Sequence, residues 1–99
     1  MAKILWRQKA IDDLSEIWEY TIQEWSVTQA DKYFEIIKLA CNEIAGKPGT
    51  GKVYTEISNN LLGLRCGKHI IFYHIISVDE IELIRILHES MDLKKRITE

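Results

Sequence analysis

The sequence has little proline and cysteine and no long apolar run. Its 99 residues include one proline and two cysteines, and 46% of them are hydrophobic. This composition, without a low-complexity tract, is typical of a folded globular protein. No run approaches the roughly 20 apolar residues that a membrane-spanning helix needs, and the first residues lack the basic and then apolar pattern of a secretion signal. We therefore predict one domain, residues 1–99, that is cytoplasmic and does not contact membranes.

Patterns for a disulfide, a metal site or a nucleotide site are also missing. Cys41 lies in a helical pattern and Cys66 in a β-prone run, and neither has the closely spaced Cys or His neighbours of a zinc site. The glycines of Lys47–Lys52, KPGTGK, lie too close together for a phosphate-binding P-loop. We expect two small buried cysteines, no metal and no cofactor.

The charge balance argues against a nucleic-acid binder. The chain has 13 Lys/Arg and 15 Asp/Glu, a net charge of −2, and its first 46 residues carry five basic against eight acidic side chains. Domains that bind nucleic acid usually show a basic excess. The basic run Lys94–Arg96 is predicted to be a solvated, frayed end. We therefore expect no direct nucleic-acid binding by the chain alone.

Two amphipathic helices are predicted in the first half of the chain, after a short β-prone run at Lys3–Arg7. Apolar residues at three- and four-residue steps predict the first helix over Ala10–Trp25. Thr28 and Asp31 resemble a capping pattern for a second helix, which should end at Gly46. Because the break between the helices is only about three residues, they should form an antiparallel hairpin.

The second half predicts three strands. Leu61–Ile76, LLGLRCGKHIIFYHII, should fold back at Gly67–Lys68, because glycine at the first position of a two-residue loop suits a type II′ turn. That turn sets a register in which Cys66 faces His69. A last strand follows at Ile81–His88, IELIRILH. The predicted fold class is α+β, in the order β-α-α-β-β-β, with the helical hairpin packed on a mostly antiparallel sheet.

The predicted central strand, His69–Ile76, has apolar residues on both faces. One face should lie under the helices. The other is either covered by the C-terminal segment or left exposed for a partner, and an exposed apolar face of that size would indicate a binding protein.

No set of residues in the sequence forms a convincing catalytic site. The two-residue period of a strand places His69 and His74 on opposite faces, and it separates Arg85 from His88 in the same way. Nucleophilic catalysis also needs a base and an orienting group beside the nucleophile. We predict no catalytic residue, and an ion pair with a carboxylate of its own strand or of a helix would explain Arg85 equally well.

Four segments of the chain resemble the ParE toxins of the RelE/ParE superfamily. They read AIDDLSEIWEYTIQEW, QADKYFEIIKLACNEIA, GLRCGKHIIFYHI and IELIRILHESMD, and the resemblance runs from Ile4 to Asp92. It implies the toxin of a type II toxin–antitoxin pair, which inhibits DNA gyrase by protein binding, without a metal or cofactor, and is neutralised by a ParD-like antitoxin. It therefore implies an inhibitor more than an enzyme.

The resemblance also implies which residues contact the target or the antitoxin. Carried over by position, these are Arg65, Tyr73, Arg85, His88, Met91 and Asp92. We expect the antitoxin to dock on the uncovered sheet face and its junction with the helical hairpin, in contact with Tyr73.

Two alternatives to the gyrase inhibitor stay open. Ser90 and His74 stand where ParE-like chains commonly carry arginine. This difference leaves open a homologue that has lost toxicity and only binds antitoxin. The other alternative is a RelE-like, ribosome-dependent mRNA endonuclease with Arg65, Arg85 and His88 as its active groups.

The endonuclease is disfavoured by residues that the RelE-like branch relies on. That branch uses basic residues in the hairpin and last strand and a tyrosine near the C-terminus. Here Ile70 and Glu89 occupy the corresponding basic positions, and no tyrosine follows Tyr73. These differences and the net negative charge favour the gyrase inhibitor.

Overall fold

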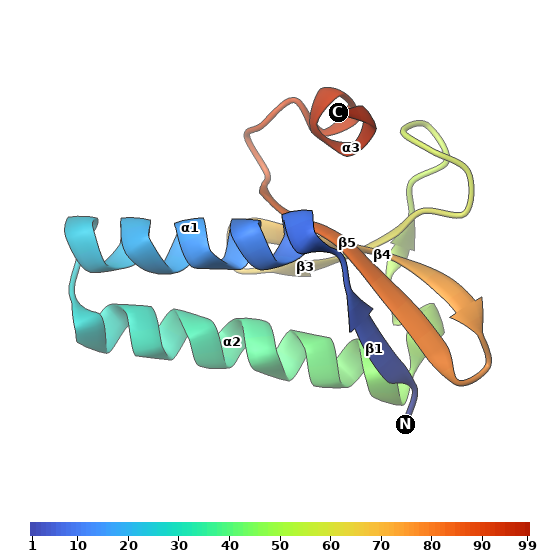
Figure 1. The fold of residues 1–99 in the computed structure, drawn as a ribbon, viewed down its shortest axis with the longest axis horizontal. Helices are drawn as coiled ribbons and strands as arrows, with labels where there is room; N and C mark the ends of the chain where they lie inside the picture. Colours follow the sequence, from blue (N-terminus) through green and yellow to red (C-terminus); the bar gives the residue numbers. More distant parts are fainter.

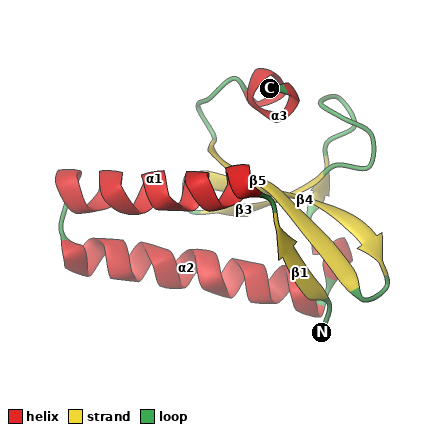
Figure 2. Cartoon of the chain, in the orientation of Figure 1, coloured by secondary structure: helices red, strands yellow, loops and turns green.

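The computed structural model describes residues 1–99, with five strands and three α-helices (Figures 1 and 2). In chain order the elements are β1 (Lys3–Trp6), α1 (Gln8–Glu24), α2 (Val27–Gly46), the 3-10 turn η1 (Pro48–Thr50), β2 (Lys52–Val53), β3 (Leu62–Cys66), β4 (His69–Ser77), β5 (Glu80–His88) and α3 (Leu93–Thr98). No helix has both the length and the apolar composition to cross a bilayer.

The helices α1 and α2 form the predicted antiparallel hairpin, with one difference at their junction. The N-cap of α2 is Ser26, whose side chain accepts a hydrogen bond from the Gln29 N–H at 3.1 Å. The prediction that Thr28 caps this helix was wrong, because Thr28 already lies inside α2. The predicted end of α2 at Gly46 is confirmed.

The sheet has the strand order β1-β5-β4-β3-β2. The edge strand β1 runs parallel to β5, and the other pairs are antiparallel, so the prediction of a mostly antiparallel sheet is confirmed. The expected register is confirmed, since Cys66 faces His69 and Arg65 faces Ile70. Gly67 has a φ of +60°, which a type II′ turn requires at its first central position. The turn chemistry therefore fixes the pairing of β3 with β4.

The helical hairpin covers one face of the sheet and forms the first core. Ile37, Cys41 and Ile44 of α2 pack against Ile71 of β4 and Leu83 of β5, and all five are buried. Burying side chains of this size contributes roughly 1.5–3 kcal/mol each. This core anchors the inner half of the hairpin to the sheet.

A second core lies on the other face of the sheet, under α3 and the segment between β2 and β3 (Figure 1). Its buried members are Leu61, Ile70, Phe72, Ile84 and Leu87. The sheet face is therefore covered by this chain, which was one of the two open possibilities. The expected antitoxin site was the uncovered sheet face and its junction with the helical hairpin; the first part is wrong, because this face is not uncovered, and the junction stays a prediction.

The C-terminal segment is an ordered helix, and the prediction of a frayed end at Lys94–Arg96 was also wrong. Leu93 and Ile97, four residues apart, point the apolar side of α3 at the second core. The Asp92 side chain caps the helix by accepting a hydrogen bond from the Lys95 N–H at 3.2 Å. The cap and the four-residue spacing were visible in the sequence, but a helix of six residues depends on the sheet for its stability.

Candidate functional site

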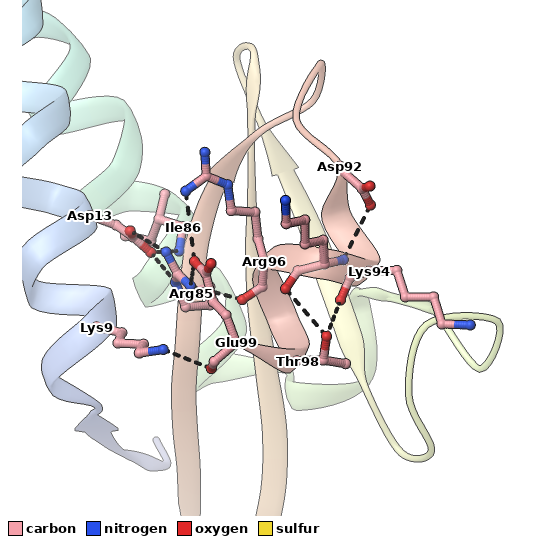
Figure 3. A network of polar contacts seen from close by, with 10 residues as sticks. Lys9, Asp13, Arg85, Ile86, Asp92, Lys94, Arg96, Thr98 and Glu99 are labelled. Atoms are coloured by element: carbon pink, nitrogen blue, oxygen red, sulfur yellow. Dashed lines mark hydrogen bonds and ion pairs between the residues drawn. The ribbon is translucent and has the colours of Figure 1, made fainter.

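Arg85, a predicted contact residue, is held inside the protein by an ion pair with Asp13 of α1 (Figure 3). Its Nε donates to Asp13 Oδ2 at 2.8 Å and its Nη2 to Oδ1 at 2.9 Å, and each residue is only 8% exposed. The same carboxylate accepts the N–H of Ile86 at 3.0 Å. These hydrogen bonds raise the pKa of Arg85 above its usual value, so the guanidinium stays charged.

The other side of the Arg85 guanidinium holds α3 in place (Figure 3). Its Nη1 donates to the backbone carbonyl of Arg96 at 2.9 Å and to Glu99 Oε1 at 3.1 Å. The bond from Arg85 lowers the pKa of the Glu99 carboxyl. Arg85 therefore joins α1, β5 and α3, and the suggestion that it pairs with an acidic helix residue is confirmed.

A β-bulge sits beside Arg85. Phe72 pairs with Arg85 while the next residue, Tyr73, pairs with Leu83, which leaves Ile84 as an extra residue in β5. Bulges bend a strand and redirect a side chain. The bulge lies where β5 supplies both Ile84 to the second core and Arg85 to Asp13.

Tyr73 is fully buried in the first core. Its hydroxyl donates to the Pro48 carbonyl at 2.6 Å and accepts the Gly51 N–H at 3.0 Å. Burial raises the pKa of this phenol, so it remains protonated. Tyr73 ties the segment after α2 to the sheet and presents no surface to a partner.

The remaining predicted contact residues lie nearer to solvent. Arg65 is exposed and forms an ion pair with Glu89 at the end of β5. Met91 is 40% exposed, and Asp92 caps α3. His88 is half-buried and lies on the side of the sheet that faces the hairpin. Arg65, Arg85 and His88 therefore do not converge on one site.

His88 instead faces His69, its cross-strand partner, and the two rings are in edge contact with centroids 5.2 Å apart. Both line an open groove of about 480 Å³ whose other walls come from α1, α2 and the β3–β4 turn. The sequence did not identify this groove. Its residues lie far apart in the chain, and Trp25 and Tyr33 fit the helical core pattern equally well.

Hydrogen bonds hold both imidazoles in the groove. The Tyr33 hydroxyl lies 2.6 Å from His69 Nδ1, 3.1 Å from the Cys66 carbonyl and 3.2 Å from the Lys68 N–H. His88 Nδ1 accepts the N–H of Ser90 at 3.1 Å. Neutral His88 therefore carries its ring proton on Nε2, as a hydrogen-bond donor.

The electrostatics of this site favour a neutral His69. Burial, and then the nearby His88, lower the pKa of His69 to about 4. Burial also raises the pKa of Tyr33. Near pH 7 the pair is an uncharged tyrosine hydrogen-bonded to an uncharged imidazole, a rigid element of the groove floor.

A family model for the ParE toxin of the type II toxin–antitoxin system parDE matches residues 4–93, nearly the whole of the described fold. The chain belongs to the ParE toxin family. The resemblance seen in its four sequence segments is thereby confirmed.

Individual relatives agree with this membership. Toxin ParE1 of Mycobacterium tuberculosis (strain CDC 1551 / Oshkosh) is 32% identical over 84 residues, which cover 85% of this chain and 86% of that toxin. Toxin ParE1 of Caulobacter vibrioides is 31% identical over 90 residues, which cover 91% and 92% of the two chains. Toxin ParE of Escherichia coli is 30% identical over 87 residues, which cover 88% and 84%.

A solved structure shares the fold. The chromosomal ParDE TA system from P. aeruginosa contains a chain that superposes with a TM-score of 0.75 at 18% identity, over 89% of this chain and 96% of that one. The α+β arrangement of strand, helical hairpin and sheet is therefore the ParE fold.

The two cysteines of this ParE-family chain are not suited to nucleophilic catalysis. The thiols of Cys41 and Cys66 are both buried, and burial raises the pKa of Cys41 to about 11 and that of Cys66 as well. Neither is a thiolate nucleophile at neutral pH. The groove offers hydrogen-bond donors and aromatic surface, which are features of a recognition site.

The depressed pKa of His69 predicts a dependence of stability on pH. Between its ordinary pKa of 6.5 and its folded pKa of about 4, the unfolded chain binds a proton that the folded chain does not. The free energy of unfolding should therefore fall as the pH drops through this window. From pH 7 to pH 5 we expect wild type to lose on the order of 1 kcal/mol more than His69→Gln, after a discount for the partial exposure of the ring.

Urea denaturation of both proteins at the two pH values measures this difference. His74, whose pKa is also lowered by burial, contributes equally to the two proteins and cancels. Parallel losses in wild type and His69→Gln would contradict the prediction.

Proposed function

We propose that this chain, a ParE-family toxin, blocks DNA gyrase by binding it and is neutralised by a ParD-like antitoxin. The observation that carries the proposal is the family match over residues 4–93. Its relatives are named as toxins, and the similar solved structure is described as a chromosomal ParDE TA system. The expected mode of action is protein binding, without a metal or cofactor.

The separation of the basic and histidine side chains favours binding over mRNA cleavage. An endonuclease would need a base and a phosphate-holding arginine at one site. Arg65 is at the surface, Arg85 is buried against Asp13, and His88 faces the hairpin. The three proposed nuclease groups are therefore engaged with different partners, Glu89, Asp13 and Ser90, which disfavours joint catalysis.

Among the six candidate contact residues, Arg65 and Met91 are proposed to meet the target directly, and no role is proposed for His88. Arg65, near the end of β3, and Met91, after the end of β5, are both exposed. Tyr73, Arg85 and Asp92 are proposed to act indirectly, because their side chains hold the sheet and α3 together.

Expression of the chain should arrest bacterial growth, and the purified protein should inhibit supercoiling by DNA gyrase. Co-expression of the small protein encoded beside its gene should restore growth. The double variant Arg65→Ala/Met91→Ala should weaken gyrase inhibition by at least about tenfold, the size expected for loss of a central contact. Lys38→Ala, on the exposed side of α2, is the matched control and should inhibit like wild type.

Full supercoiling activity at micromolar concentrations of folded protein would overturn the gyrase proposal. Growth arrest with cleavage of mRNA on the ribosome would favour the endonuclease. Binding of the neighbouring protein without any growth arrest would indicate a homologue that has lost toxicity.

A further inference from the structure

Charge is divided unevenly between the two faces of the sheet (Figure 1). The hairpin helices α1 and α2, on one face, carry three Lys against eight Asp/Glu, a net charge of 3 − 8 = −5. The short helix α3, on the other face, reads LKKRIT and carries three cations and no carboxylate, a net charge of +3. The net charge of −2 for the whole chain therefore combines an acidic hairpin with a basic α3.

Two of the three cations of α3 have no partner in the chain. Lys94 and Lys95 are exposed and form no ion pair, whereas Arg96 pairs with Glu99 at 3.7 Å. Lys94 also lies in the first turn of α3, where a positive charge is unfavourable to the helix dipole. Figure 3 shows its side chain extending away from the Arg85 network. Contacts inside the chain therefore do not account for the two lysines, which are available to an anionic partner.

The helix that carries these lysines is fixed in place. The Asp92 side chain caps its start, and the Arg85 guanidinium donates to the Arg96 carbonyl near its end. Leu93 and Ile97 pack against the second core between these two points. The lysines therefore project from an ordered backbone, so binding a partner requires little further ordering of the chain.

The residues proposed above to meet the target lie beside α3. Arg65 faces Ile70 across the β3–β4 pair, and residues directly opposite each other in an antiparallel pair point to the same side. Ile70 belongs to the second core, which α3 covers. Arg65 thus shares the face of α3, and Met91 directly precedes the Asp92 cap of this helix.

We propose that Lys94 and Lys95 of α3 contact the phosphates of the duplex DNA that gyrase holds, when the chain is bound to gyrase. The assignment rests on the gyrase target proposed above. An enzyme that supercoils DNA must hold a duplex, which carries about one negative charge per 1.7 Å of its axis. Because the acidic hairpin is repelled by this charge and α3 is attracted, the α3 face turns towards the DNA.

The free cations of α3 suit phosphates better than protein carboxylates. A lysine presents a compact, mobile charge, whereas the planar guanidinium that binds a carboxylate with two bonds is engaged here in the pair of Arg96 with Glu99. Two lysines are few beside the roughly six to ten phosphate contacts of a protein that binds DNA by itself. The contact therefore adds to the binding of gyrase, in agreement with the expectation that the chain alone does not bind nucleic acid.

The affinity of the fluorescently labelled chain for purified gyrase, measured by anisotropy with and without a duplex that gyrase binds, tests the proposal. The duplex should tighten the binding of wild type at least about tenfold at about 0.1 M salt, and Lys94→Gln/Lys95→Gln should lose most of this gain. The salt dependence with DNA should become shallower by about two phosphate contacts in the variant. Its affinity for gyrase without DNA should equal that of wild type.

The matched control removes the same charge elsewhere. Lys38→Gln/Lys47→Gln changes two exposed lysines, one in α2 and one directly after it, on the hairpin side of the sheet. It should keep the full gain from DNA and the salt dependence of wild type. Circular dichroism should show that both double variants keep the fold, because all four lysines are exposed.

The outcomes separate this contact from the gyrase proposal. No gain from DNA in wild type, or an equal gain in wild type and Lys94→Gln/Lys95→Gln, would overturn the contact and leave the gyrase target intact. Equal weakening of this variant with and without DNA would place α3 on an acidic protein surface and overturn it as well. Equally tight binding of the duplex without gyrase would overturn it in favour of a chain that binds DNA by itself. A wild type that binds gyrase under neither condition would overturn both proposals.

Discussion

Asp13→Ala is expected to destabilise the protein by about 3–5 kcal/mol, the cost of leaving one member of a buried ion pair without its partner. Asp13 receives two bonds from the Arg85 guanidinium and a third from the N–H of Ile86. The variant would leave the Arg85 charge buried, since that residue is 8% exposed, with the more exposed Glu99 carboxylate as its remaining ionic partner. It would also loosen α1 and α3 from β5, because Arg85 contacts both helices.

A second variant separates the charge effect from the packing effect. Asp13→Leu/Arg85→Met removes both charges and keeps apolar volume, so it should be more stable than Asp13→Ala alone. Urea denaturation monitored by tryptophan fluorescence measures both. A loss below about 1 kcal/mol in Asp13→Ala, the value typical of exposed pairs, would mean that solvent reaches this pair.

Tyr73→Asp is expected to prevent folding, because it places a carboxylate in the first core where the native side chain is fully buried. Tyr73→Phe keeps the ring and removes only the hydroxyl. It should cost about 1–3 kcal/mol, since the Gly51 N–H and the Pro48 carbonyl would both lose their hydrogen-bond partner.

Comparing Tyr73→Asp with Tyr73→Phe shows whether Tyr73 acts by supporting the fold or by contacting the antitoxin directly. Thermal denaturation and circular dichroism measure folding, and calorimetry measures affinity for the antitoxin. Tyr73→Phe should bind the antitoxin like wild type at temperatures where it is folded. Weaker binding by a fully folded Tyr73→Phe would place its hydroxyl in the interface and contradict its role inside the core.

The pairing of β3 with β4 and the helical hairpin were predictable because local chemistry specifies them. Gly67 supplies the positive φ of a two-residue turn, and the turn then dictates that Cys66 faces His69. The helical period of the first half similarly fixes which side of α1 and α2 is apolar. Ser26 was missed as the cap because Thr28, two residues later, also carries a hydroxyl that could accept a backbone N–H.

The candidate site was less predictable from the sequence. Alternation along a strand placed Arg85 and His88 on opposite faces. The sequence was also consistent with an ion pair between Arg85 and a helix carboxylate, which the structure identifies as Asp13. The family resemblance placed Tyr73 at a contact surface, and alternation along the strand gave no information on depth that would have shown it to be buried. The pattern at Leu93 and Ile97 was too short to predict a helix without the sheet face that it covers.

The sequence by itself determined the α+β class, the helical hairpin, the turn at Gly67 and membership of the ParE toxin family, because these depend on periodicity, turn residues and motifs read locally along the chain. Only the tertiary structure decided that α3 covers the second sheet face, that Arg85 is buried with Asp13, and that Trp25, Lys32 and Lys68 line one groove. These features join residues far apart in sequence, and packing and burial exist only once the chain is folded.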